Sequence, residues 1–162
     1  SNQSSLTNDS GHCHPGLKVH KAHLTELLRT VVRASIEFKC ECRVTFHKAF
    51  DMVDNSMEAL NTLIEINNEL QSEFNLPFTI IDTILTSGAE GARDLTSKVC
   101  VSVDNNGAHY TNINQMVELA QRNNISIMPG GGVRSENAQL ILSQCPRVDS
   151  LHSSKILMVK RE

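Results

Sequence analysis

The feature that most constrains this chain is the regular alternation of amphipathic helical patterns with short, nearly continuous apolar runs. Apolar residues recur every three or four positions, as on one face of a helix, over 17–38, from Asn55, over 111–124 and from Ser135. The short apolar runs typical of strands cover 42–51, 78–88, 125–132 and 147–155. Such alternation indicates parallel strands joined by right-handed crossovers. The sequence therefore predicts an α/β fold.

The same pattern predicts how the chain is divided and where its helices begin. Residues 1–16 are polar and predict an N-terminal loop, and residues 17–162 predict one domain. Asn55, Asn112 and Ser135 precede helical patterns and carry side chains that can cap a helix. We expect these three residues to begin the second, third and fourth helices.

Polar side chains and glycines gather at the carboxyl end of each expected strand. Side chains alternate along a strand, so apolar neighbours such as Val44 and Phe46 suit a layer of helices on the other face. Ligands bind at the carboxyl ends of strands in barrels and in open α/β sheets alike. The sequence therefore predicts one polar site at a common rim. Its candidate residues are Thr45, His47, Lys48, Asp51, Thr86, Ser87, Gly88, Gly130, Gly131, Gly132, His152, Ser153 and Ser154.

The run of three glycines, Gly130 to Gly132, has two interpretations. A glycine loop after a strand exposes backbone N–H groups to an anion, and the positive end of the helix that begins near Ser135 adds to the attraction. Alternatively, the run is only a tight turn that fits the strand to the helix. Both interpretations stay open, because glycine runs alone are weak signals.

Two histidines on the expected rim, His47 and His152, are candidates for acid–base work, because imidazole titrates near neutral pH. Asp51 or Lys48 could tune them, and hydrogen-bonded structural histidines are the alternative. No nucleophile–base spacing, phosphate-binding loop motif or zinc motif identifies a reaction. The sequence therefore predicts no specific enzymatic activity.

Composition excludes several classes of protein. The net charge of −3, the pI of about 6.1 and an aromatic content of 4% without Trp argue against nucleic-acid binding. No apolar run approaches the roughly 18 residues that a membrane span needs. The N-terminal residues lack the apolar centre of a secretory signal, which predicts a cytoplasmic protein.

Four ordered motifs resemble the copper homeostasis protein CutC family. They are "VTFHKAFDM" (44–52), "ILTSGAEGA" (84–92), "IMPGGGV" (127–133) and "VDSLHSSK" (148–155). "SLTNDSG" (5–11) is similar to a family segment that follows the fourth strand. Two departures are Lys48, where the family usually has Arg, and Leu151, where it usually has an aromatic residue.

The resemblance implies a cytosolic TIM-like (β/α)₈ barrel with a role in copper homeostasis, as a binding, trafficking or tolerance protein. The alternative is a TIM-barrel enzyme, or a truncated remnant of one, that acts on a small anionic or phosphorylated metabolite. A TIM barrel takes at least about 200 residues, and this chain matches the last four β/α units. Either another copy completes the barrel as a homo-oligomer, or the sequence is a fragment, and we favour the fragment.

Copper is the cofactor or cargo that the resemblance implies, and Cu(I) prefers thiolate, thioether and imidazole ligands. The five cysteines are odd in number and lack the spacing of a disulfide framework, so we expect reduced thiols. "HCH" (His12, Cys13, His14) and "CEC" (Cys40 to Cys42) are the candidate ligand sets, and incidental placement is the alternative for both.

Overall fold

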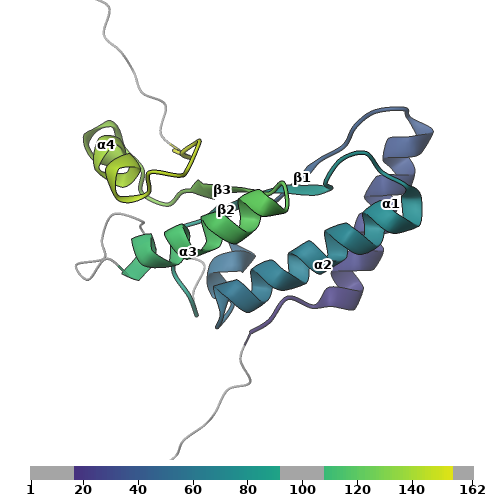
Figure 1. The fold of residues 1–162 in the computed structure, drawn as a ribbon, viewed down its shortest axis with the longest axis horizontal. Coiled ribbons are helices and arrows are strands. Elements are labelled where there is room, and N and C mark those ends of the chain that lie inside the picture. Colours follow the sequence, from purple (N-terminus) through teal and green to yellow (C-terminus); the bar gives the residue numbers. More distant parts are fainter. Residues whose placement is uncertain (1–16, 92–107, 155–162) are drawn as a thin grey trace, which may run out of the picture.

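The computed structural model describes residues 17–91 and 108–154 of the chain (Figure 1). Helices alternate with strands throughout these ranges. The elements are α1 (Lys21–Glu37), β1 (Val44–His47), the short 3₁₀ helix η1 (Ala49–Met52), α2 (Ser56–Phe74), β2 (Ile81–Thr86), α3 (Ala108–Arg122), β3 (Ser126–Pro129) and α4 (Ser135–Gln144). The expected α/β alternation is confirmed.

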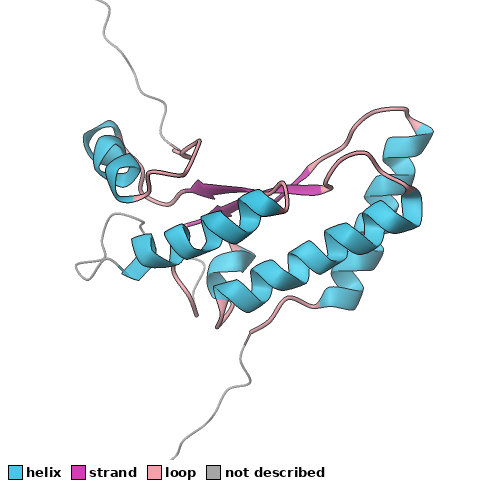
Figure 2. Ribbon diagram, in the orientation of Figure 1, coloured by secondary structure: helices cyan, strands magenta, loops and turns pink. Residues whose placement is uncertain are grey.

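The strands form a three-stranded parallel sheet in the order β1-β2-β3 (Figure 2). In its register, His47 lies opposite Leu85, and Leu85 lies opposite Met128. All three carboxyl ends therefore lie along one edge, as the alternation predicted. The expectation of parallel strands is confirmed.

Within the described part of the chain, one face of the sheet packs on helices and the other does not (Figure 1). Ile84 of β2 and Ile127 of β3 are buried in one core with residues of α2 and α3, such as Leu63 and Met116. On β1, Val44 and Phe46 pack against this core, whereas Thr45 and His47 alternate with them and are exposed. The uncovered face is therefore the one that carries the polar side chains of β1.

The expected fourth strand over 147–155 is wrong for the residues that are described there. Residues 148–154 have no strand assignment, and 155 lies outside the described ranges. One backbone hydrogen bond, from His152 N to Pro129 O at 2.9 Å, ties this segment to β3. A single backbone bond does not form the ladder of bonds that defines a strand, so the apolar run remains irregular.

Two of the three expected helix caps are also wrong. Asn55 does cap α2, because its Oδ1 accepts from Glu58 N at 2.8 Å. Asn112 lies inside α3, which begins earlier than the apolar spacing indicated. Ser135 is the first helical residue of α4, and the preceding N–H of Arg134 donates instead to Asn137 Oδ1 at 2.7 Å.

Candidate functional site at the carboxyl edge of the sheet

The carboxylate of Asp51, on η1 directly after β1, joins the ends of the first two strands. It accepts hydrogen bonds from Thr86 Oγ1 at 2.5 Å and from Ser87 Oγ at 2.9 Å. The backbone N–H of Ser87 donates to the same carboxylate at 3.1 and 3.2 Å. The structure therefore brings together three of the candidate residues, and Asp51 acts there as the acceptor that orders the turn after β2.

The turn after β2 uses most of its own polar groups. Gly88 N donates to Thr86 Oγ1 at 3.0 Å, and Ala89 N donates to Ser87 Oγ at 3.3 Å. Asn112 of α3 donates to Gly88 O at 3.0 Å. Thr86 and Ser87 are almost fully buried. Their hydroxyls are therefore engaged in hydrogen bonds within the rim itself.

The triple glycine turns sharply between β3 and α4. Gly130 N continues the sheet by donating to Thr86 O at 2.8 Å. Gly131 and Gly132 have φ values of +86° and +74°, which side-chain-bearing residues rarely adopt. Two successive residues in this conformation turn the backbone sharply between β3 and α4.

Hydrogen bonds from three directions fix the glycine turn. Asn137 Nδ2 donates to Gly132 O at 3.0 Å, and Ser153 Oγ donates to Val133 O at 2.8 Å. Arg134 Nη1 also donates to Val133 O, at 2.7 Å, which keeps a half-buried guanidinium beside the turn. Sequence reasoning missed Arg134 and Asn137, although a side chain three residues after a helix N-cap is a spacing that predicts such a bond.

His152 lies at the glycine turn, but His47 does not reach it. A Cβ placed on Gly130 would lie 3.4 Å from His152 Cβ and 2.4 Å from Leu85 Cδ1. His47 pairs with Leu85 on β1, so two strands separate it from the segment of His152. Neighbouring strands lie about 4.8 Å apart, which places the two histidine backbones about 14 Å apart. The structure does not unite them as an acid–base pair.

Lys48 is exposed at the tip after β1, and its φ of +43° is unusual for a residue with a side chain. Thr45 and His47 precede it on the uncovered face, and both are exposed. Residues held in rare backbone conformations cluster at functional sites. Lys48 therefore presents a positive charge at the same rim, across the sheet from the glycine turn. Ser154, the other candidate at that end, is exposed as well.

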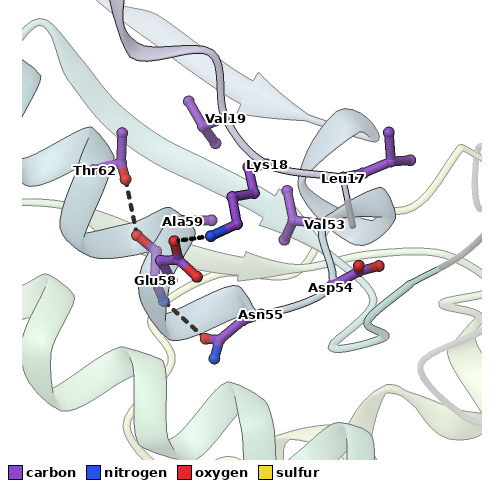
Figure 3. A pocket seen from close by; sticks show the side chains of 9 residues that line it. All are labelled: Leu17, Lys18, Val19, Val53, Asp54, Asn55, Glu58, Ala59 and Thr62. Atoms are coloured by element: carbon purple, nitrogen blue, oxygen red, sulfur yellow. Dashed lines mark hydrogen bonds and ion pairs between the residues drawn. The ribbon is translucent and has the colours of Figure 1, made fainter. Parts of the chain in front are cut away.

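A small pocket lies beside the rim and includes none of the candidate residues (Figure 3). It encloses about 70 Å³. Its lining residues are Leu17, Lys18, Val19, Val53, Asp54, Asn55, Glu58, Ala59 and Thr62. Lys18 Nζ donates to Glu58 Oε1 at 2.7 Å, a bond that raises the pKa of Lys18 above its usual value. Lys18 and Glu58 thus pair with each other among the lining residues.

The Cys40 and Cys42 thiols lie at the opposite end of the sheet, because they precede β1. Both are free, Cys40 exposed and Cys42 half-buried. Ser35 fixes this turn: its Oγ donates to Cys40 O and accepts from Cys42 N at 3.3 Å. The third described cysteine, Cys145, is buried, and desolvation raises the pKa of its thiol to about 11.

No cluster of three or more His, Cys, Asp or Glu residues suited to a metal ion occurs within 17–91 and 108–154. His12, Cys13 and His14 lie outside these ranges. Cys40 and Cys42 are therefore a pair of soft ligands without a third described partner. Thiolate pairs suit Cu(I) better than they suit harder cations.

A parallel sheet with helices on one face and polar groups at its carboxyl edge defines the class of protein: a partial TIM-like (β/α)₈ barrel. The fold is similar to the crystal structure of a protein described as CutC from Streptococcus agalactiae, with a TM-score of 0.53 and 23% identity. The likeness covers 85% of this chain and 52% of that one. At this identity the similarity concerns the fold alone.

The chain belongs to the CutC family, whose sequence model matches residues 17–157. A copper homeostasis protein cutC homolog from Dictyostelium discoideum is 32% identical over 114 residues, which is 67% of this chain and 36% of that relative. The homologs so named from Mus musculus and Homo sapiens are each 35% identical over 99 residues, 61% of this chain and 26% of each relative. The chain thus spans about a third or less of these relatives. The expected family is confirmed.

None of the helices in the described part of the chain is both long enough and apolar enough to cross a membrane.

Proposed function

We propose that this chain serves copper homeostasis in the cytoplasm by binding Cu(I) as cargo on the Cys40 and Cys42 thiolates. The observation that carries the proposal is the turn itself, which holds two free thiols two residues apart. Ser35 holds the backbone of both cysteines, so little ordering remains to be done when a metal binds. Family membership and the names of the relatives support copper as the metal.

The exposure of the two cysteines also supports this assignment. An exposed Cys40 can take Cu(I) from a donor molecule, and a half-buried Cys42 can shield the metal from solvent. Cys145 lacks both properties, because it is buried, and the desolvation raises the pKa of its thiol to about 11. The chain therefore offers Cys145 as a reference cysteine of different environment.

An anaerobic titration with Cu(I) against a colorimetric chelator tests the proposal. We expect stoichiometric uptake by the wild type, loss of uptake in the double variant Cys40→Ser/Cys42→Ser, and wild-type uptake in the control Cys145→Ser. A variant that replaces His12, Cys13 and His14 tests the other ligand set. If that variant alone loses copper, the assignment to Cys40 and Cys42 is wrong.

A second candidate function is the binding of a small anion, such as a phosphorylated metabolite, at the rim. It is supported by the glycine turn, because Gly131 and Gly132 stand beside the Arg134 guanidinium at the start of α4. A helix N-terminus and turned backbone N–H groups together favour negative charge. Further polar groups at this edge are Lys48, Ser153 and the neighbouring His152. We assign binding here and no reaction.

Titration with inorganic phosphate, followed by the amide NMR signals of Gly131 and Gly132, tests this second candidate. We expect both signals to shift, and we expect Arg134→Ala to weaken binding about tenfold, the effect of losing one charge-assisted hydrogen bond. Arg147→Ala is the matched control, since Arg147 pairs with Gln121 elsewhere on the surface. Unshifted glycine signals, or equal affinities for the two variants, would reject the anion site.

A further inference from the structure

The turn that joins α1 to β1 fixes the position of Cys40 at the end of the helix (Figure 1). Lys39 adopts the left-handed conformation, with a φ of +51°, and reverses the direction of the chain. Its N–H donates to Ile36 O at 3.2 Å, and the N–H of Cys40 donates to Ser35 O at 3.0 Å. These two bonds form the Schellman motif that commonly ends a helix. The backbone of Cys40 is therefore held by the last turn of α1.

The side chain of Ser35 links Cys40 to Cys42. Ser35 is buried, and its Oγ donates to Cys40 O and accepts from Cys42 N at 3.3 Å. One hydroxyl oxygen thus contacts backbone groups of both cysteines, so these groups lie on the same side of the chain. In an extended segment, residues i and i+2 also share a face with their side chains. This arrangement places both thiols on one face of the turn.

The spacing of the two cysteines suits a disulfide bond. A disulfide joins Cα atoms that are about 4.4–6.8 Å apart. Two residues of fully extended chain span at most about 7 Å, so a small bend brings the Cα atoms of Cys40 and Cys42 into this range. A ring closed over one intervening residue restricts the unfolded chain little, which gives such a bond little stabilising effect. We therefore expect a disulfide that is easily reduced again.

The charges around the turn do not repel an anionic reactant. Glu41 pairs with Arg43, and Arg43 Nη1 lies 3.6 Å from Asp82 Oδ2. Lys39 adds a second cation directly before Cys40. The two cations and the two carboxylates cancel, so a negatively charged small molecule can approach the exposed Cys40.

We propose that Cys40 and Cys42, positioned by Ser35, form a reversible disulfide by exchange with a small-molecule disulfide, and that this oxidation releases Cu(I). The Cys40 thiolate attacks the small disulfide, whose S–S bond breaks, and one small thiol leaves. Cys42 then attacks the sulfur of Cys40 in the mixed disulfide, and the second small thiol leaves. The two cysteines lose two electrons and two protons, and the small disulfide takes up both as it becomes two thiols.

The release of copper rests on the proposed function of the same two residues. Cu(I) prefers thiolate sulfur, whereas the sulfur atoms of a disulfide carry no charge. Oxidation therefore removes both ligands in one reaction, and reduction restores them. Cys145 takes no part, because it is buried and a small disulfide cannot reach it. The redox state of the surroundings thus decides whether the turn can hold copper.

Mass spectrometry of the whole chain after exposure to oxidised glutathione tests the disulfide. Trypsin cuts after Lys39 and after Arg43, so peptide 40–43 contains both cysteines. We expect this peptide to become lighter by two hydrogen atoms, to regain them with dithiothreitol, and Cys145 to remain a free thiol throughout. Two free thiols in this peptide after exposure, or a disulfide that joins it to another cysteine, would overturn the proposal.

Two variants test the order of the steps and the role of Ser35. Cys42→Ser lacks the second thiol, so it should retain glutathione on Cys40 where the wild type closes the ring. Ser35→Ala should slow ring closure about tenfold, as expected for the loss of a hydrogen bond that positions the pair. Thr25→Ala is the matched control, since it removes another buried hydroxyl of α1, which bonds to Lys21 O at 2.9 Å. Circular dichroism establishes that each variant is folded, and equal rates in the two alanine variants would refute the positioning by Ser35.

Anaerobic titration with Cu(I) of the reduced and the oxidised chain, each freed of small thiols by gel filtration, tests the switch. We expect the oxidised chain to take up at least tenfold less copper than the reduced chain, and reduction to restore the uptake. Equal uptake by the two forms would refute the release of copper. A reduced chain that takes up none rejects the proposed function, whereas the peptide masses decide the disulfide independently of copper.

Discussion

Gly88 sits where a side chain would collide with the backbone of α3. Its φ is +82°, and a Cβ would lie 2.4 Å from His109 O. We expect Gly88→Ala to lower the free energy of unfolding by about 2–4 kcal/mol, since strain and a backbone clash add. Urea denaturation measures this loss. Gly91→Ala is the matched control: its φ is +64°, but the nearest atom, Asp54 Oδ1, is 3.6 Å away.

For Gly91→Ala we expect only the cost of the left-handed conformation, about 1–2 kcal/mol. The difference between the two alanine variants therefore isolates the close approach of α3 to the turn after β2. Equal losses in the two variants would mean that Gly88 is required for its backbone angle alone.

Cys145 makes the stability of the chain depend on pH in the alkaline range. Burial raises the pKa of its thiol from 9.0 to about 11, so the folded state keeps a proton that the unfolded state has lost between these values. The contribution of this thiol to the free energy of unfolding is therefore fully present below pH 9 and is lost as the pH rises to about 11. Urea denaturation at several pH values measures the decline.

Lysines with raised pKa values, such as Lys18 and Lys21, add a decline of the same sign in this range. The comparison with Cys145→Ala isolates the thiol, because that variant should lose stability less steeply between pH 9 and 11. Identical slopes for the two proteins would contradict a buried, protonated thiol.

At the scale of elements, one side chain ties α2 to the beginning of β2. Asn67 is buried, and its amide donates to Ile81 O at 3.0 Å and accepts from Ile81 N at 2.9 Å. We expect Asn67→Leu to cost about 2–4 kcal/mol, because it leaves a buried backbone donor and acceptor unpaired. Gln71→Leu, which removes one half-buried bond to Phe78 O, should cost about 1 kcal/mol. Thermal denaturation ranks the two variants, and the reverse ranking would contradict this role.

The sequence predicted the helices and strands whose bounds follow from hydrophobic periodicity. It did not predict features that depend on contacts between distant parts of the chain. The alternation of Ile125, Ile127 and their polar neighbours is visible in the chain, so β3 and its buried face could be predicted. Asn112 has the residue type of a cap, but its partner, Gly88 O, lies on a distant turn. No local sequence pattern predicts this hydrogen bond, because its two partners lie 24 residues apart in the chain.

The residues 148–154 show the same limit at a sheet edge. Their apolar run has the composition of a strand, yet a strand also needs neighbours, and here one backbone bond is made. The grouping of Asp51 with Thr86 and Ser87 could be predicted from parallel strand ends. That their hydroxyls donate to Asp51 depends on a geometry that strand order does not specify.

For the whole molecule, the described strands carry the candidate groups to one edge but keep them apart along it. One strand, β2, separates His47 on β1 from the glycine turn after β3. The order of the motifs predicted the parallel strands and their common edge, whereas the separation of the groups along that edge became visible only in three dimensions.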